Sequence, residues 1–317
     1  MAQKTNNNAP VVMTEKRGFP FMKLKWQFIS ISLVLGALSL YFMIERGLNL
    51  GVDFKGGIKL VYQFKQPTSD GKIRSLIESL GVGDVQVVRF GDESDNSFLI
   101  KIKQQEERDI VKEITGKLTG ELGADGFTLL SEESVGAKVG ADLRKRGFFA
   151  MGLTWLLMLV YIGWRFDFLF APGAIVALLH DVIISLGFFV FFGKEFNLPI
   201  LAAVLTLIGY SVNDTVIIFD RIRENLKKLP SSLPLADLIN QSVNETLSRT
   251  IITSLTVLFA MIVLFLFGGG VIHDFAFFMI VGAIVGSYST IFIASPVYLA
   301  FNRFFPHRGL VRGIGKR

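Results

Sequence analysis

Long apolar runs separated by polar stretches dominate this chain. The first run spans Trp26–Ile44. A helix of that length is about 28 Å long, enough to cross the hydrocarbon core of a bilayer. The run ends in Ile44-Glu45-Arg46 rather than in a small-residue cleavage site, which favours a retained helix over a cleaved signal peptide. Five further runs follow, at Gly147–Trp164, Phe168–Phe192, Leu198–Phe219, Ile251–Phe267 and Phe275–Phe301.

The long polar segment between the first two runs has a different pattern. Short apolar stretches typical of strands alternate with segments of helical periodicity, in the order β-α-β-β-α-β, which is the ferredoxin-like arrangement. Strands are predicted at Ile58–Phe64, Val85–Phe90, Phe98–Ile102 and Phe127–Ser131, and helices at Gly71–Leu80 and Glu106–Leu118. The predicted fold class is a membrane α-helical protein with six transmembrane helices and one α+β ferredoxin-like domain between helices 1 and 2.

Lysine and arginine are distributed unevenly around the six runs. The two short loops on one side hold only Lys194, whereas the tails and loops on the other side are rich in both residues. By the positive-inside rule, both termini are expected in the cytoplasm and the large domain on the outer side. The expected divisions are a cytoplasmic tail (1–25), helix 1 (26–45), the outer domain (46–146), the bundle of helices 2 to 6 (147–303) and a basic tail (304–317).

Residues 232–249, between the fourth and fifth runs, carry an apolar stripe of helical spacing. This stripe predicts an amphipathic helix along the cytoplasmic interface. Its apolar members are Leu235, Leu238, Ile239, Val243 and Leu247. In the sixth run, Gly282 and Gly286 form a GxxxG pattern, which favours close contact with another helix.

Composition narrows the range of functions. Hydrophobic residues make up 51% of the chain, and the chain has no cysteine. Disulfides, thiolate metal sites and cysteine nucleophiles are therefore excluded. The sequence contains neither a phosphate-binding loop nor an oxygen-rich metal motif, so we expect no enzyme, no cofactor and no metal site. The net charge of +6 is better explained by membrane-anchoring lysine and arginine than by nucleic-acid binding.

Asn213 and Asp214 interrupt the fourth apolar run. A carboxylate near the middle of a membrane helix costs roughly 2.5–3.5 kcal/mol, so such residues usually face a bundle interior or a wet cavity and take part in ion movement. Apolar surroundings favour the protonated form of a carboxyl group, and a nearby guanidinium favours the ionised form. Asp214 is therefore a candidate relay residue; the alternative is a static buried hydrogen bond or ion pair.

Other polar residues in or near the runs admit two readings each. Arg249 lies where the fifth run begins. It is either a relay partner of Asp214 or an anchor at the membrane interface. His180 and Asp181 lie near the middle of the third run. They form either a secondary relay or a structural hydrogen bond between helices. The charged cluster just after the fourth run indicates a solvated helix end. Its members are Asp220, Arg221, Arg223 and Glu224.

Five motifs occur along the chain in this order: GVDFKGG (Gly51–Gly57), ESVGAKVGADL (Glu133–Leu143), ALLHDVIISLG (Ala177–Gly187), IGYSVNDTVIIFDRIREN (Ile208–Asn225) and LSRTIITS (Leu247–Ser254). Together they resemble the SecF family of protein-export membrane subunits, within the resistance-nodulation-division (RND) superfamily. The resemblance extends from about Trp26 to Phe301.

The resemblance implies six spans that form half of an RND-type core, in a bacterial inner membrane, with a periplasmic domain after the first span. It implies a SecD partner with six matching spans, and proton flow that drives motion of the outer domains. That motion would pull preproteins from the SecYEG channel. Carried over to this chain, the proton-path residue is Asp214 and the essential basic residue is Arg249. Asn213 is expected to face the relay of SecD. The sequence leaves open whether H⁺ or Na⁺ is the driving ion.

Two other functions stay open at this point. One is half of an RND-type exporter of small molecules or lipids, although a single outer domain of about 90 residues is small for a drug pocket. The other is a scaffold of the translocon that moves no ions. Asp214 distinguishes the scaffold from an ion-driven subunit, because a scaffold has no need of a buried carboxylate.

Overall fold

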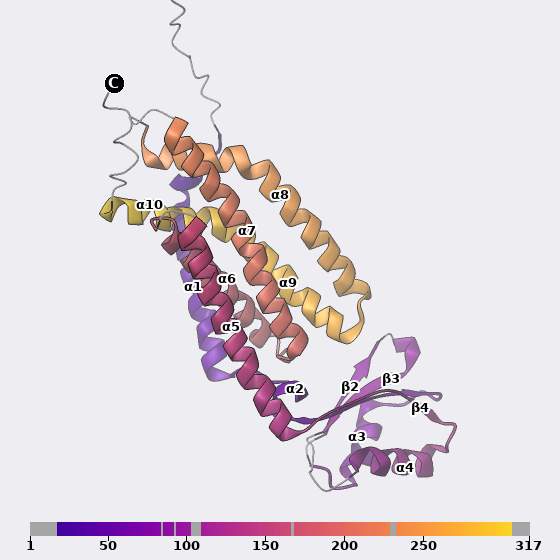
Figure 1. The fold of residues 1–317 in the computed structure, drawn as a ribbon. Coiled ribbons are helices and arrows are strands. Elements are labelled where there is room, and N and C mark those ends of the chain that lie inside the picture. Colours follow the sequence, from indigo (N-terminus) through magenta and orange to yellow (C-terminus); the bar gives the residue numbers. More distant parts are fainter. Residues whose placement is uncertain are drawn as a thin grey trace, which may run out of the picture.

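The computed structural model describes residues 18–83, 85–91, 93–102, 109–165, 168–228 and 233–305. Figure 1 shows a bundle of long helices with a small α+β domain beyond one end. The start of α1 (Lys25–Glu45) and the end of α10 (Ser295–Phe304) lie at the opposite end of the bundle. Most of the expected N-terminal tail and of the expected basic C-terminal tail lies outside the described residues.

The α+β domain has the predicted β-α-β-β-α-β order. Its sheet is antiparallel throughout, with the strands in the order β2-β3-β1-β4. This is the ferredoxin-like topology, and α3 and α4 cover one face of the sheet (Figure 1). The strands are β1 (Gly57–Phe64), β2 (Val85–Phe90), β3 (Ser97–Ile102) and β4 (Phe127–Val135), and the helices are α3 (Asp70–Glu78) and α4 (Ile110–Leu122).

Side-chain periodicity explains how this domain forms its core. On β1, Leu60, Tyr62 and Phe64 alternate with residues of the other face and are buried at 3% exposure or less. On α4, Ile110 and Ile114 stand one turn apart and are fully buried against the sheet. Each helix begins at a side-chain cap, Ser69 for α3 and Asp109 for α4, whose oxygen accepts a first-turn backbone N–H.

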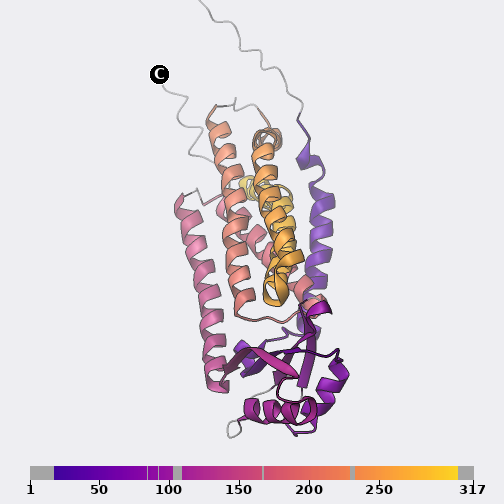
Figure 2. The same cartoon turned by 90° about the vertical axis from the view of Figure 1, so that its right-hand side faces the viewer.

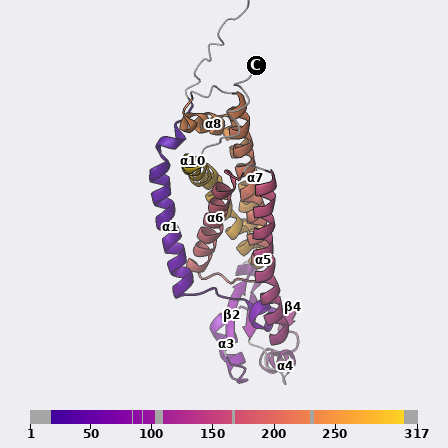
Figure 3. The same ribbon diagram turned by 60° about the vertical axis from the view of Figure 1, so that its left-hand side comes forward.

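Among the described residues, six helices are long and apolar enough to cross a membrane, as predicted. In three of these six the most apolar window is more than half buried, and in the other three it is 6–11% buried. The bundle core is therefore built from α6, α7 and the last span, with α1, α5 and α8 around it. Figures 2 and 3 show α1 and α5 on opposite flanks of that core. Besides α1 and α10, the helices of the bundle are α5 (Ala137–Arg165), α6 (Ala171–Phe191), α7 (Leu198–Lys228), α8 (Leu235–Phe267) and α9 (Gly269–Ser289).

Two spans differ in detail from the pattern in the sequence. The stretch expected as an amphipathic helix and the fifth span form one helix, α8, because the sequence from Leu235 to Phe267 contains neither glycine nor proline. Figure 1 shows α8 running across the end of the bundle before it descends along the bundle. The sixth span is interrupted by a π-helical turn at Thr290–Ala294, after which α10, with Pro296 in its first turn, continues in a new direction.

The GxxxG pattern of the sixth span lies at a close helix contact. A Cβ atom added to Gly282 would lie 2.6 Å from the side chain of Leu207 on α7. One added to Gly286 would lie 3.5 Å from a carboxylate oxygen of Asp181 and 3.6 Å from Ser211. These two glycines let α9 approach α6 and α7 at the level of the buried polar residues.

Candidate functional site

Helix α7 places Asp214 inside the bundle and the residue before it, Asn213, on the outside. Asp214 is 1% exposed, whereas Asn213 is exposed on the surface of this chain. Neighbouring residues of an α-helix point about 100° apart, so one faces the core and the other faces outward. The sequence predicted that Asp214 faces the interior. That Asn213 faces the relay of a partner stays a prediction.

The carboxylate of Asp214 has few partners. The hydroxyl of Ser254 on α8 donates to its Oδ2 over 3.4 Å, which is a long hydrogen bond. Ser287 of α9 donates to that same Ser254 hydroxyl at 2.9 Å. Thr253 also lies beside Asp214, but its hydroxyl donates to backbone oxygens of α8. Oδ1 of Asp214 is buried without a hydrogen-bond partner among the described residues.

A second polar atom near Asp214 is also unpaired. Tyr210 stands one turn before Asp214 on α7. Its buried hydroxyl lies beside Ser254 and Ser287 but makes no hydrogen bond of good geometry with the described residues. Buried polar groups are nearly always hydrogen-bonded in folded proteins. The unsatisfied oxygens of Asp214 and Tyr210, both beside Ser254, therefore need an explanation. The arrangement can accept a proton, a water molecule or a small cation at Asp214.

Arg249 lies on α8, five residues before Ser254, and is exposed. Among the described residues, no carboxylate lies within ion-pair distance of its guanidinium. One turn earlier, Glu245 accepts hydrogen bonds from Arg221 and Asn225 of α7. These contacts hold α8 beside α7, and Arg249 is near enough to Asp214 to interact with it electrostatically.

Asp181 on α6 forms a separate buried centre, 0% exposed. Its Oδ2 accepts hydrogen bonds from Ser211 of α7 at 2.6 Å and from Ser289 of α9 at 2.8 Å. Its Oδ1 lies 2.9 Å from Nδ1 of His180. The other ring nitrogen of His180 lies 3.1 Å from the hydroxyl of Tyr288. In contrast to Asp214, Asp181 has a partner on each of its oxygens.

The sequence analysis missed the segment of α9 that connects the two centres. Four consecutive residues carry hydroxyl groups: Ser287 reaches the Asp214 centre, Tyr288 and Ser289 reach the Asp181 centre, and Thr290 lies 3.3 Å from Thr215 of α7. A run of four hydroxyl side chains inside an apolar span was the available signal, and the last of them, Thr290, is the first residue of the π-helical turn.

The fold and this arrangement can be compared with known proteins. Residues 116–303 match the family described as "Protein export membrane protein SecD/SecF, C-terminal", and residues 41–68 match the "SecD/SecF GG Motif". The protein translocase subunit SecF of Desulfurispirillum indicum is 43% identical over 286 residues, 87% of this chain and 89% of that protein. The chain belongs to the SecF family.

Other SecF proteins and two solved structures agree with this assignment. The SecF subunit of Rickettsia prowazekii is 41% identical over 303 residues, 95% of this chain and 96% of that protein. The crystal structure of SecDF from Thermus thermophilus, described as a translocon-associated membrane protein, superimposes with a TM-score of 0.80 at 35% identity. A second SecDF structure, in a super-membrane-facing form, gives a TM-score of 0.67 at 34% identity.

The SecF-like chain is much shorter than the solved SecDF chains. The two superpositions cover 90% and 91% of this chain, but only 39% of each SecDF chain. The matched part covers most of this chain, whose fold has six long apolar helices among the described residues and a small antiparallel sheet, in agreement with the RND-type core half predicted from the sequence. SecF homology and six apolar helices make this chain a multi-pass inner-membrane protein.

Proposed function

We propose that this chain is the SecF subunit of a Sec protein-export accessory complex. In this proposal, ion flow through the membrane domain drives motion of the α+β domain, which pulls preproteins from the SecYEG channel. The observation that carries the proposal is Asp214, a carboxylate buried at 1% exposure in an apolar bundle, with one oxygen that has no hydrogen-bond partner among the described residues. Such a group is costly in a membrane and is found mainly where ions move.

Asp214 and Arg249 have complementary parts in this scheme. The protonated form of Asp214 is favoured when its surroundings are apolar, and the ionised form is favoured when the guanidinium of Arg249 approaches. Arg249 is exposed and unpaired in the described part of the chain, so its long side chain has freedom to move toward Asp214. A cycle of approach and withdrawal would load and release a proton.

The partner that completes the ion path would be SecD. Asn213 faces away from the bundle core on α7, and the most apolar window of α8 is only 6% buried. An amide and a long apolar face at this surface fit a second membrane half better than lipid alone. We therefore propose a heterodimer with SecD, in which Asn213 faces the relay of the partner, with lipid around the remaining surface.

The proposed orientation follows the charge distribution. Lysine and arginine gather at the end of the bundle where α1 begins and α10 ends, so that end is proposed to lie in the cytoplasm. The α+β domain at the other end would then be periplasmic, where emerging preproteins are found.

His180 and Asp181 suit a structural role better than a second relay. The three donors around Asp181 come from its own helix and from two neighbouring helices, and they leave neither carboxylate oxygen idle. A group held in this way cross-links α6, α7 and α9 and has no free site for an incoming ion. The contrast with Asp214 is the reason for placing the relay at Asp214.

The test uses Asp214→Asn in a complex with SecD, in membrane vesicles. Asparagine keeps the shape of the side chain but cannot titrate, so we expect ion flux and ion-driven export to fall about 100-fold or more. Asp220→Asn is the matched control, because Asp220 is an exposed carboxylate on the same helix and should leave both quantities unchanged. An Asp214→Asn protein that is abundant, paired and fully active would disprove the relay and favour a scaffold.

Two variants of Arg249 separate a relay partner from an anchor. Arg249→Met should abolish ion-coupled export, and Arg249→Lys should keep part of it, because lysine retains the charge but not the reach or the planar donor group. If Arg249 only anchors the helix, lysine should restore full activity, and methionine should disturb topology instead of flux. Varying pH and Na⁺ separately in the same vesicles identifies the driving ion.

A further inference from the structure

The chain between α1 and β1 is joined to the connection between α6 and α7. The backbone N–H of Gly51 donates to the carbonyl of Phe196 at 2.8 Å, and the N–H of Phe196 donates to the carbonyl of Asn49 at 2.8 Å. Leu50 and Phe196 form a short parallel bridge. The base of the α+β domain is thereby fixed to the residues that immediately precede α7.

Asp53, in the short helix α2 (Val52–Lys55), makes the most specific contact at this junction. Its Oδ2 accepts a hydrogen bond from the backbone N–H of Leu198, the first residue of α7, at 2.9 Å. Its Oδ1 accepts a hydrogen bond from Lys59 of β1 at 3.3 Å. The side chains of Asp53 and Lys59 are each only 12% exposed. One carboxylate therefore bridges the first strand of the domain and the first turn of α7.

The position of Asp53 suits the electrostatics of a helix start. The first N–H groups of a helix have no partner within the helix, and the helix dipole favours negative charge there. Asn197 satisfies a second such group, the N–H of Ile200, at 3.1 Å. The start of α7 is thus capped twice, once by the adjacent Asn197 and once by Asp53, which lies 145 positions before Leu198.

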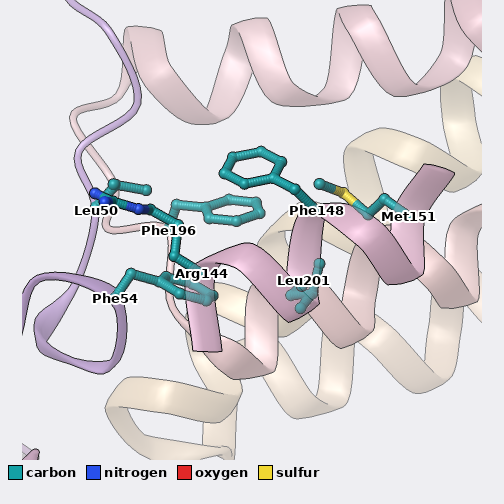
Figure 4. A pocket seen from close by; sticks show the side chains of 8 residues that line it. Leu50, Phe54, Arg144, Phe148, Met151, Phe196 and Leu201 are labelled. Atoms are coloured by element: carbon teal, nitrogen blue, oxygen red, sulfur yellow. The ribbon is translucent and has the colours of Figure 1, made fainter. Parts of the chain in front are cut away.

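Apolar contacts surround the polar junction. The rings of Phe54 and Phe196 stack with centroids 5.7 Å apart, and both residues are 3% exposed. Figure 4 shows the two rings beside Leu201 of α7 and below Phe148 and Met151 of α5, around a small apolar pocket. Low exposure keeps water from competing for the Asp53 hydrogen bonds.

A second polar link lies beside the first. Lys101 of β3 pairs with Glu195, two residues before Asn197, at 2.7 Å, and these side chains are 16% and 17% exposed. Lys194 pairs with Asp274 of α9 at 2.7 Å. The connection before α7 is therefore held by the α+β domain on one side and by α9 on the other.

We propose that Asp53 is a positioning residue that locks the start of α7 to the base of the α+β domain, so that the domain and α7 move as one body. This inference rests on the proposed function of Asp214. Asp214 lies sixteen positions after Leu198 on the same helix, about 24 Å along its axis. A continuous helix of that length transmits a displacement from one end to the other, so protonation at Asp214 is connected to the domain through Asp53.

The test compares Asp53→Ala and Asp53→Asn in the SecD-paired chain. Asp53→Ala removes the oxygen that accepts from Leu198, and Asp53→Asn keeps an acceptor oxygen but removes the charge. Asp109→Ala is the matched control, because Asp109 also caps a helix with its carboxylate, but that helix, α4, belongs to the same domain rather than to the bundle. Three quantities are measured: hydrogen exchange of the amides at the start of α7, ion flux, and export of a preprotein.

For Asp53→Ala we expect faster exchange at the start of α7 and export reduced about fivefold or more, the size of effect that loss of a helix cap has on a local equilibrium. Ion flux should continue, because the Asp214 centre is untouched. Asp53→Asn should recover part of the export. Flux without export is a result that a purely structural defect would not give, because misfolding lowers both together.

Two results would overturn the proposal. One is normal export by Asp53→Ala although hydrogen exchange at the start of α7 has increased. The other is a parallel loss of flux and export in Asp53→Asn at normal abundance, which would place Asp53 on the ion path. Neither result bears on the relay itself, which fails only if Asp214→Asn retains flux.

A charge exchange gives an independent check that does not depend on the Asp53 variants. Glu195→Lys should reduce export and keep flux, since it puts a lysine opposite Lys101. Adding Lys101→Glu restores an opposite-charge pair and should restore export. If export by the double variant stays as low as export by Glu195→Lys, the defect did not come from the broken link between the domain and the start of α7. The proposal would then be wrong.

Discussion

Removal of the Asp181 carboxylate is the perturbation whose size can be worked out best from the structure. Asp181 is the common acceptor for Ser211, Ser289 and His180, at 2.6, 2.8 and 2.9 Å. Asp181→Ala leaves three donors without this acceptor in a place where the parent side chain is 0% exposed. Ser289 has an alternative, because its hydroxyl also lies 3.2 Å from the carbonyl of Gly286.

The expected cost follows from these contacts. A buried donor that loses its acceptor costs about 1–3 kcal/mol. With Ser289 able to turn to Gly286, two donors remain, and the emptied volume adds a further term. We expect Asp181→Ala to lower the free energy of unfolding by about 3–5 kcal/mol. Asp181→Asn keeps one acceptor oxygen and should cost about 1–2 kcal/mol.

The assay is reversible unfolding of the purified chain in mixed detergent micelles, with ion flux measured in vesicles for the same variants. Asp220→Asn is the control, because Asp220 has a half-exposed side chain and its ion pairs, at 3.5 and 3.7 Å, are of the weak surface kind. It should change stability by no more than about 0.5 kcal/mol.

Two outcomes would refute the structural reading of Asp181. If Asp181→Ala were as stable as the Asp220 control, the three hydrogen bonds would not hold the helices together. If Asp181→Asn unfolded normally but lost ion flux, Asp181 and His180 would be a second relay. The expected combination is lower stability with flux retained in Asp181→Asn.

Three further predictions concern the α+β domain and the topology. Gly56→Ala should cost roughly 2–5 kcal/mol, because φ is +78° there and the new Cβ would lie 2.6 Å from backbone of α5; Gly71→Ala, with open space around it, is the control for thermal unfolding. Burial raises the pKa of Tyr62 above its ordinary 10.0, so the contribution of the neutral phenol to stability is full below pH 10 and is lost as pH rises through the folded-state pKa. The melting temperature should therefore change less across pH 10 in Tyr62→Phe than in the parent chain. Cysteines placed at Ser94 and Lys228, in a chain that has none, should react with impermeant reagents from opposite sides of the membrane, and reaction from one side would contradict the proposed orientation. The residue Ser232, in the same connection as Lys228, lies outside the described residues.

The sequence by itself determined the elements whose signals are local. Six apolar runs correspond to six long helices, and the β-α-β-β-α-β order corresponds to the observed sheet, because hydropathy and side-chain period act within one element at a time. The burial of Asp214 was also predictable, since a carboxylate in an apolar run has few stable places except inside a bundle. Element ends were less accurate: β4 extends to Val135, four residues past its expected end.

Only the tertiary structure decided which polar residues meet. Asp53 and Leu198 are 145 positions apart, and His180 and Tyr288 are 108 apart, so no local pattern connects them. Serine and threonine occur in many membrane helices without a specific partner, and the hydroxyls at 287–290 gain their meaning only once α9 lies against α6 and α7.

The two buried carboxylates show the limit most clearly. Asp181 and Asp214 look alike in the sequence, each a lone acidic residue in an apolar run. In the fold, Asp181 has donors on both oxygens, whereas the part of the chain that the structure describes gives Asp214 one long hydrogen bond and leaves its other oxygen without a partner. That difference arises from the neighbouring helices, because hydrogen bonds depend on distances of a few tenths of an ångström that hydropathy does not encode.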